Sequence, residues 1–279
     1  MDRIPVLLRV LPLLVCGLIL VGCKHSSEPQ VNSAKGSHGK HGQHAEHNAR
    51  RTAELVIKSI PETIEPGESI DISVSLRTGD GSTTKAFEPT HEKLAHLIIV
   101  RKGLDLFAHL HPELDSDGNF KTNYTFPESG TYHVFLDYKV KGELTSTARS
   151  ELKVAGIPRV AKPLKNNIPG EIASDDLRAF VSHCTSGSEQ ILAFKISDKD
   201  NKPVDDLEPY LGAMGHLVVL SGDASQYVHA HPVPQTGEKN LVEFEVHYPY
   251  PGIYKGWGQF QRNGKVHTIP VVMEVPSKR

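Results

Sequence analysis

The chain of 279 residues has little cysteine, methionine or tryptophan, and neither sign of charge is in excess. It contains three cysteines, three methionines and one tryptophan, and its formal net charge is −2. A balanced charge leaves no basic stripe of the kind that binds nucleic acid, so we expect no nucleic-acid partner. Scarce methionine argues against a typical Cu(I) carrier, because such proteins rely on soft sulfur ligands. Beyond residue 22 no stretch approaches the ~20 apolar residues that a helix needs to cross a bilayer.

The few cysteines limit the covalent chemistry of the chain. Cys16 and Cys23 lie within or directly after the apolar run at the N-terminus, and Cys184 is the one cysteine further along the chain. If Cys16 is removed with a leader and Cys23 is modified, no intrachain disulfide can form, although an oxidising compartment would permit one. We interpret Cys184 as a small buried apolar residue, and a metal or redox role beside His183 is the alternative.

The first 22 residues predict a secretory signal peptide. Arg3 and Arg9 lie before an apolar run over residues 10–21, and the small residue Gly22 follows that run. A basic start, an apolar run of this length and a small residue at the cleavage site are typical of signal peptides rather than of membrane spans.

The residues around the expected cleavage site predict a lipid anchor. The segment Leu20-Val21-Gly22-Cys23 resembles the lipobox of bacterial lipoproteins, which implies cleavage before Cys23 and lipidation of its thiol. Lys24 stands where inner-membrane lipoproteins have aspartate, so the resemblance favours the outer membrane if the source is Gram-negative. We therefore expect a protein of the bacterial cell envelope that is bound to the lipid membrane through Cys23. An ordinary signal peptide with an incidental cysteine is the alternative.

Residues 23–50 predict a flexible tether, because they contain almost no large apolar side chains. Within the tether, His38, His41, His44 and His47 recur at every third position. A short histidine-rich tract is typical of segments that bind borderline metals such as Cu(II), Ni(II) or Zn(II). A solvated spacer is the alternative interpretation.

The rest of the chain consists of two similar halves, a first module over 51–156 and a second over 165–277. Both are built from short alternating apolar runs with Gly, Pro, Asp and Asn between them, and neither shows a helical period. Matching segments recur, such as Gly130-Thr131-Tyr132 and Gly252-Ile253-Tyr254. The pattern predicts an all-β fold with two tandem immunoglobulin-like antiparallel β-sandwiches after the tether.

Each half carries the same three histidines, displaced by 120 positions, and histidine is the commonest metal ligand in proteins. The resulting metal-ligand candidates are His96, His109, His111, His216, His229 and His231.

The spacing predicts that each set of three lies on one face of a β-hairpin. If the loop 102–105 is symmetric, His96 lies opposite His111 and Ile98 opposite His109. Residues at alternate positions share a face, and directly opposed Cβ atoms lie ~4.5–5.5 Å apart, so three imidazoles can converge on one ion. The same arithmetic places His216 opposite His231. The prediction depends on register, because a slip of one residue would separate the histidines.

Weaker ligand candidates differ between the halves. His133 corresponds to Lys255, and Met214, whose thioether would suit Cu(I), corresponds to Leu94. No catalytic residue is assigned. Three histidines with an open position also suit a metalloenzyme, but no general base accompanies both sets, and the recurring Glu88 and Glu208 are better explained by turns.

The two modules resemble a group of secreted bacterial proteins with an H-L-φ-φ-φ … F-x-H-x-H-P element, where φ is apolar. The first module has His96-Leu97-Ile98-Ile99-Val100 and then Phe107-Ala108-His109-Leu110-His111-Pro112. The second has Gly212-Ala213-Met214-Gly215-His216-Leu217-Val218-Val219-Leu220, which is the closer match. This group is similar to the YtkA-like and other small copper-associated Ig-like periplasmic domains. The resemblance implies a β-sandwich and metal handling in the cell envelope, but no settled activity.

Two functions from different classes follow from the sequence. The first is an envelope lipoprotein that binds a copper or zinc ion through histidine clusters, for metal buffering, delivery or resistance. The second is a non-enzymatic adhesion or scaffold lipoprotein that holds another envelope protein and whose histidines are structural. Metal binding by the folded modules distinguishes the two.

Overall fold

The computed structural model describes residues 53–174, 176–186, 189–235 and 237–277. The expected signal peptide, Cys23 and the tether histidines His38, His41, His44 and His47 lie outside this part of the chain. The described residues form seventeen β-strands and no helix. Consequently they include no helix that is long and apolar enough to cross a membrane.

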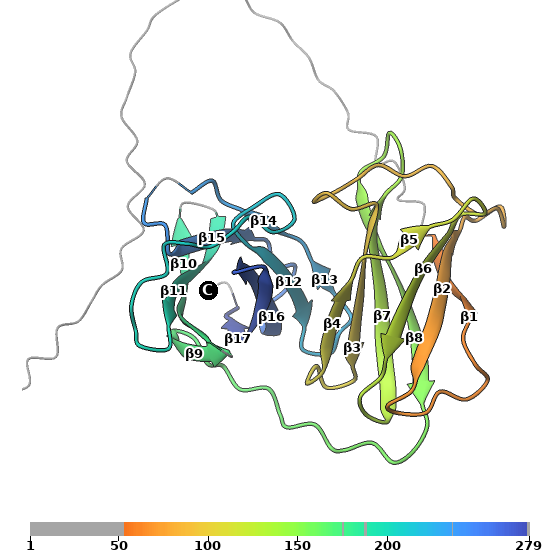
Figure 1. Cartoon of the computed structure of the whole chain (residues 1–279), viewed down its shortest axis with the longest axis horizontal. Coiled ribbons are helices and arrows are strands. Elements are labelled where there is room, and N and C mark those ends of the chain that lie inside the picture. The colour runs from red at the N-terminus through yellow and green to blue at the C-terminus, as the bar shows by residue number, and fades with distance from the viewer. Residues whose placement is uncertain (1–52, 175, 187–188, 236, 278–279) are drawn as a thin grey trace, which may run out of the picture. The chain divides into compact units, whose positions relative to one another are not determined.

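Module 1 is an antiparallel sandwich of two four-stranded sheets, shown in orange to green in Figure 1. One sheet has the order β1-β2-β6-β5 and the other β4-β3-β7-β8. In chain order, strands β1 to β8 span Glu54–Ser59, Ser69–Arg77, Ala95–Arg101, Phe107–Leu110, Glu113–Leu114, Asn119–Thr125, Gly130–Lys139 and Thr145–Val154.

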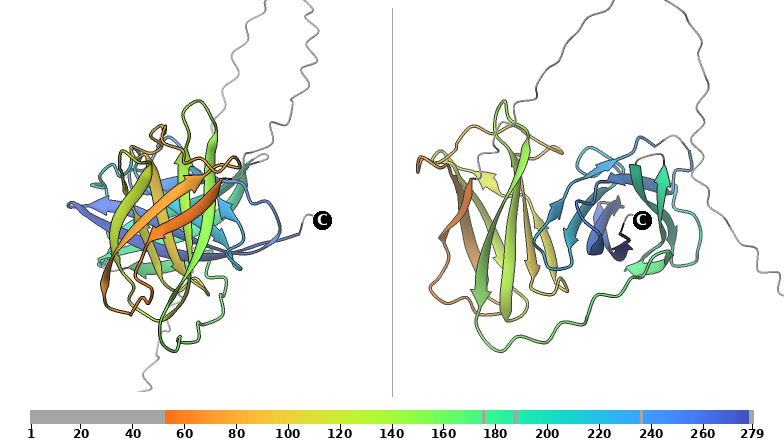
Figure 2. Two further views of the ribbon diagram at one scale, coloured as in Figure 1. Left: turned by 90° about the vertical axis from the view of Figure 1, so that its right-hand side faces the viewer. Right: turned by 180° about the vertical axis from the view of Figure 1, so that it is seen from behind.

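Module 2 repeats this architecture with a five-stranded sheet, β14-β15-β11-β10-β9, and a four-stranded sheet, β13-β12-β16-β17. Figure 2 shows the strands of both modules from behind. In chain order, strands β9 to β17 span Gly170–Ser174, Leu177–Ser186, Glu189–Asp198, His216–Ser221, Tyr227–Val228, Ala230–Pro232, Leu241–Val246, Gly252–Arg262 and Lys265–Val275. The prediction of two tandem all-β sandwiches is confirmed.

Each module has its own apolar core between its two sheets. The alternating residues Ile72, Val74 and Leu76 of β2 lie in the core of module 1 and are at most 1% exposed. Their counterparts Leu192, Phe194 and Ile196 of β11 are 0% exposed in the core of module 2. A strand with one buried face shows this period of two, which is why the sequence revealed these strands.

Strands β3 and β12 depart from that pattern because both of their faces are buried. In β3, Leu97 and Ile99 belong to the core of module 1, whereas Ile98 and Val100 belong to a third apolar cluster. We call this third cluster the shared cluster, because both modules contribute to it. Its fully buried members are Ile98, Val100, Leu104, Phe135, Val218, Leu220, Ala224 and Trp257.

The shared cluster joins equivalent positions of the duplicated sequence. Phe107 stacks on Trp257 with ring centroids 4.5 Å apart, and in the mirrored contact Phe135 lies 6.0 Å from Tyr227. Tyr227 is the counterpart of Phe107, and Trp257 is the counterpart of Phe135. Such reciprocity, in which residue i contacts j and j contacts i, is the signature of a two-fold interface. The two modules therefore contact each other as the subunits of a symmetric dimer do.

Glycine on the core face of β16 makes room for the aromatic side chains of module 2. A Cβ atom added at Gly258 would lie 2.9 Å from two ring atoms of Phe194 and 3.0 Å from Phe260. We therefore expect Gly258→Ala to lower the free energy of unfolding by about 1–3 kcal/mol, the usual cost of overpacking a core. Urea denaturation followed by circular dichroism measures this change.

Gly79→Ala is the matched control for this substitution. No atom lies within 4 Å of a Cβ atom at Gly79, so we expect a change within about 0.5 kcal/mol. Equal effects of the two substitutions would contradict the packing of β16 described above.

Candidate functional site

The hairpin of β3 and β4 brings two of the predicted histidines together. Leu97 pairs with Leu110 and Ile98 with His109, which is the register predicted from the sequence. The rings of His96 and His109 have centroids 5.1 Å apart, and His111, just beyond β4, lies 5.2 Å from His96. The predicted register is therefore confirmed and the three rings are neighbours, but His111 is not among the side chains whose ligand atoms converge.

The second hairpin begins in the predicted register and then departs from it. Val219 pairs with Val228 as expected, but β14 leaves this sheet and pairs with β15, so that His231 lies opposite Glu245. The prediction that His231 faces His216 is wrong, because the chain switches sheets after only two residues of β13. His231 is instead exposed.

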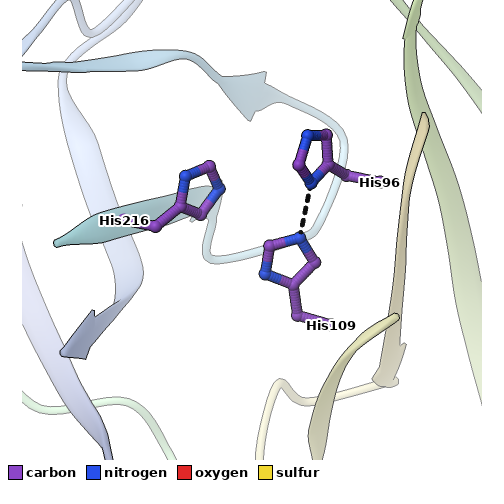
Figure 3. A group of neighbouring side chains, drawn as sticks. All are labelled: His96, His109 and His216. Atoms are coloured by element: carbon purple, nitrogen blue, oxygen red, sulfur yellow. Dashed lines mark hydrogen bonds between the residues drawn. The ribbon is translucent and has the colours of Figure 1, made fainter. Parts of the chain in front are cut away.

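His216 joins the histidines of module 1 rather than those of its own hairpin. Its ring stacks 5.5 Å from His96, its counterpart in the duplication, and lies 5.0 Å from His109. One ligand atom from each of the three rings lies within 4.8 Å of the others. Figure 3 shows the three rings turned toward one another. Instead of one cluster in each module, the chain builds a single cluster with ligand atoms from both.

Two further histidines border this group of three. The His111 ring lies 4.7 Å from His109, and the His91 ring lies 5.2 Å from His216 and 6.0 Å from His96. We call all five residues the histidine cluster. His91 was not among the predicted ligands, because its counterpart is Leu211 and the duplication therefore gave no signal for it. It occupies a tight turn, in which Thr90 and Lys93 exchange backbone hydrogen bonds and His91 has a φ of 47°.

Hydrogen bonds fix the orientation of His96 and His109. Nε2 of His96 lies 3.0 Å from the carbonyl oxygen of Thr90, which can only accept, so His96 donates from Nε2. Nδ1 of His109 lies 2.6 Å from Oε1 of Gln259, whose amide nitrogen faces the hydroxyl of Thr268. With the amide of Gln259 in this orientation, His109 donates from Nδ1. The facing nitrogens, Nδ1 of His96 and Nε2 of His109, lie 2.9 Å apart and both present lone pairs.

The five imidazoles are neutral near pH 7. Burial, together with neighbouring imidazoles, lowers the pKa of His109 to about 3 and that of His111 to about 4. The pKa of His216 is lowered to about 2 for the same two reasons, and burial also lowers the pKa of His91 and His96. Neutral imidazole is the form that binds a metal ion.

One polar contact between the modules is the counterpart of the hydrogen bond between His109 and Gln259. His229 donates from Nε2 to Oδ1 of Asp137 over 3.0 Å, and these residues are the counterparts of His109 and Gln259. Because His229 is engaged by a buried carboxylate, it is not part of the group formed by His96, His109 and His216. The scaffold is thus symmetric, but the cluster is not.

The weaker metal-ligand candidates, His133 and Met214, are not members of the histidine cluster. His133 is buried between Arg149 and Glu151, with its Nδ1 atom 3.0 Å from a carboxylate oxygen of Glu151. Met214 packs against the apolar core of module 2. His133 does not belong to the group of converging ligand atoms, and a ligand role of Met214 stays a prediction.

The family described as "Domain of unknown function (DUF8832)" matches residues 52–156 and 176–277. The two matches correspond to the two modules and together cover more than half of the chain. No curated protein matches the chain.

Several solved structures are similar to this chain at low sequence identity and low TM-score. Invasin, a bacterial integrin-binding protein, is 10% identical with a TM-score of 0.26, over 80% of this chain and 39% of its own. InvD of Yersinia pseudotuberculosis is 12% identical with a TM-score of 0.26, over 80% of this chain and 57% of its own. The titin Ig tandem A164-A165 is 14% identical with a TM-score of 0.20, over 80% and 96% of the two chains. This chain thus spans less than two thirds of invasin and of InvD.

The lowered pKa values predict that the metal-free protein loses stability in mild acid. Histidine in the unfolded chain has a pKa near 6.5. Below this pH the unfolded state therefore binds protons that the histidine cluster of the folded state does not bind. The free energy of unfolding should therefore fall from pH 6.5 to pH 5, by at most about 1.4 kcal/mol per pH unit for each such histidine. Urea denaturation in the presence of a chelator measures the slope.

His109→Gln tests the cause of this slope, because it removes a group whose pKa is lowered to about 3. We expect a shallower dependence on pH in this variant. The control is His247→Gln, because the His247 side chain is 67% exposed and should leave the slope unchanged. Identical slopes in both variants would contradict the assignment.

Proposed function

The chain belongs to the DUF8832 family, whose description names no activity, and we propose from the site itself that it binds a transition-metal ion. The ion lies among His96, His109 and His216, with copper the first choice and zinc the second. The binding serves metal buffering, delivery or resistance.

The observation that carries this proposal is the pair of lone pairs that face each other between His96 and His109. With Oε1 of Gln259 toward His109, the outer nitrogens of the two rings donate to Thr90 and Gln259, and no proton remains for the inner pair at 2.9 Å. Two acceptors at this distance repel unless a cation lies between them. The low pKa of His109, caused mainly by burial, opposes a proton in this role, and a metal ion is the remaining cation.

A buried polar atom nearby supports the same conclusion. Nε2 of His111 is buried and has no hydrogen-bond partner among the described residues. Buried nitrogens in proteins are nearly always partnered, and an ion or a water explains most exceptions. The ring of His111 lies 4.7 Å from that of His109, so this nitrogen lies beside the proposed ion site.

The donor set favours copper. Imidazole nitrogens suit Cu(II) and Zn(II), and at equal geometry affinity is higher for Cu(II). The three side chains whose ligand atoms converge are all histidines.

The cellular part of the proposal rests on the sequence. The lipobox-like segment that ends at Cys23 supports a lipid-anchored protein of the bacterial envelope, and the tether histidines would collect ions near the folded modules. The resemblance to YtkA-like domains points to the same copper-associated setting. In the alternative function, the chain is a scaffold or adhesion lipoprotein that holds another envelope protein without any metal.

Titration of the purified full chain with copper(II) and with zinc(II), by calorimetry and without a histidine tag, tests the proposal. The five histidines before residue 50 are first replaced by serine, so that only the folded modules report binding. This tether-serine background carries His25→Ser, His38→Ser, His41→Ser, His44→Ser and His47→Ser. We expect one ion per chain, with tighter binding of copper than of zinc.

Variants at the cluster should weaken binding in a graded way. His109→Gln removes a ligand and should lower copper affinity by more than about 100-fold, whereas Gln259→Leu removes its hydrogen-bond partner and should cost about 10–100-fold. The control His247→Gln changes an exposed histidine and should bind as the parent does. Absence of stoichiometric binding in the tether-serine background would overturn the proposal and favour the scaffold function.

A further inference from the structure

A polar groove lies on module 1 beside the histidine cluster. It has a volume of about 830 Å³ and is open to solvent along one side. Its polar lining includes Lys58, Asp71, Ser73, His111, Glu113 and Lys121. The two lysines and two carboxylates balance one another, and Lys121 is also paired with Asp115 at 2.8 Å. The groove therefore presents no net positive charge that would exclude a divalent cation.

His111 is the member of the histidine cluster that lines this groove. Its ring also lies 4.7 Å from His109 and 5.2 Å from His96, so one side chain contacts both the groove and the buried ligands. His96 is 1% exposed and cannot be the first ligand that an ion meets. A buried metal site requires an access path, and His111 with its groove supplies one.

His111 also differs from the inner ligands in how it is held. The outer nitrogens of His96 and His109 are fixed by Thr90 and Gln259, and such partners lock a ligand in one orientation. Among the described residues, nothing hydrogen-bonds Nε2 of His111. A ligand without such an anchor can turn between two positions at little cost, whereas an anchored ligand first has to break a hydrogen bond.

We infer that His111 is the exchange ligand of the site and carries a divalent transition-metal ion between the groove and His96, His109 and His216. This inference rests on the proposed function and extends it. His96, His109 and His216 set the affinity, and His111 sets the rate at which the ion enters and leaves. A chain with such a ligand is suited to delivering its ion to an acceptor. Release through His111 does not require His96 and His109 to break the hydrogen bonds that hold them.

Stopped-flow kinetics with copper(II) ion in the tether-serine background tests the inference. The single tryptophan, Trp257, lies two residues from Gln259 and provides a fluorescence signal for association. Release is followed after mixing the loaded protein with excess EDTA. For His111→Gln we expect both rates to fall by about tenfold or more, with the dissociation constant within about threefold of the parent.

A second variant tests the groove while all five histidines remain. Glu113 is exposed and lines the groove, so Glu113→Trp should obstruct it and slow both rates in the same way. Glu113→Ala is the matched control for loss of the carboxylate and should leave both rates within about twofold of the parent. Circular dichroism of each variant verifies that it is folded.

The outcomes separate this inference from the proposed function. A parent chain that binds no copper overturns both. A parent that binds copper, together with variants whose two rates do not fall in parallel, overturns the role of His111 alone. In particular, faster release with unchanged association in His111→Gln would make His111 an ordinary static ligand.

Discussion

The packing of β3 and β7 against β12 and β16 is the interaction on which the rest of the structure depends. These strands have one face in the core of their own module and the other face in the shared cluster, so they are buried on both sides. His96 continues the Ile98 face of β3, and His216 continues the Val218 face of β12, because alternate residues share a face. The apolar contact therefore also sets the distance between the two histidines, whose rings stack 5.5 Å apart.

Duplication explains the symmetric scaffold, and a few substitutions explain the asymmetric site. Phe107 of module 1 contacts Trp257 of module 2. Their counterparts make the same contact with the modules exchanged, because Tyr227 belongs to module 2 and Phe135 to module 1. Where module 2 places the neutral Gln259 against His109, module 1 places the acidic Asp137 against His229. The amide engages Nδ1 of its histidine and leaves Nε2 for the cluster, whereas the carboxylate engages Nε2 itself. This difference, together with the switch of β14 to another sheet, distinguishes the two halves of the interface.

The sequence predicted the part of this arrangement that local periodicity controls. Alternating triplets revealed the core strands, and a symmetric loop gave the register that pairs Ile98 with His109. The switch of β14 to another sheet depends on competition between two sheets for one short segment, which spacing does not encode. The sequence could not predict that His96 and His216 converge. Periodicity shows that a strand has an apolar face, but it does not show which other strand packs against that face. Nothing in the duplication pointed to His91, whose counterpart is a leucine.

The free energy of apolar burial, compared with that of ion binding, decides whether the site forms before an ion binds. Burial of one large apolar side chain contributes about 1.5–3 kcal/mol, so the eight buried members of the shared cluster contribute roughly 10 kcal/mol or more before ordering costs. An ion that binds only the docked modules adds about 2.7 kcal/mol at a concentration of about 100 times its dissociation constant. The apolar contact is the larger of these two gross contributions, so it is the main determinant of how the two modules face each other. An ion therefore meets ligand side chains whose strands are already positioned by the shared cluster.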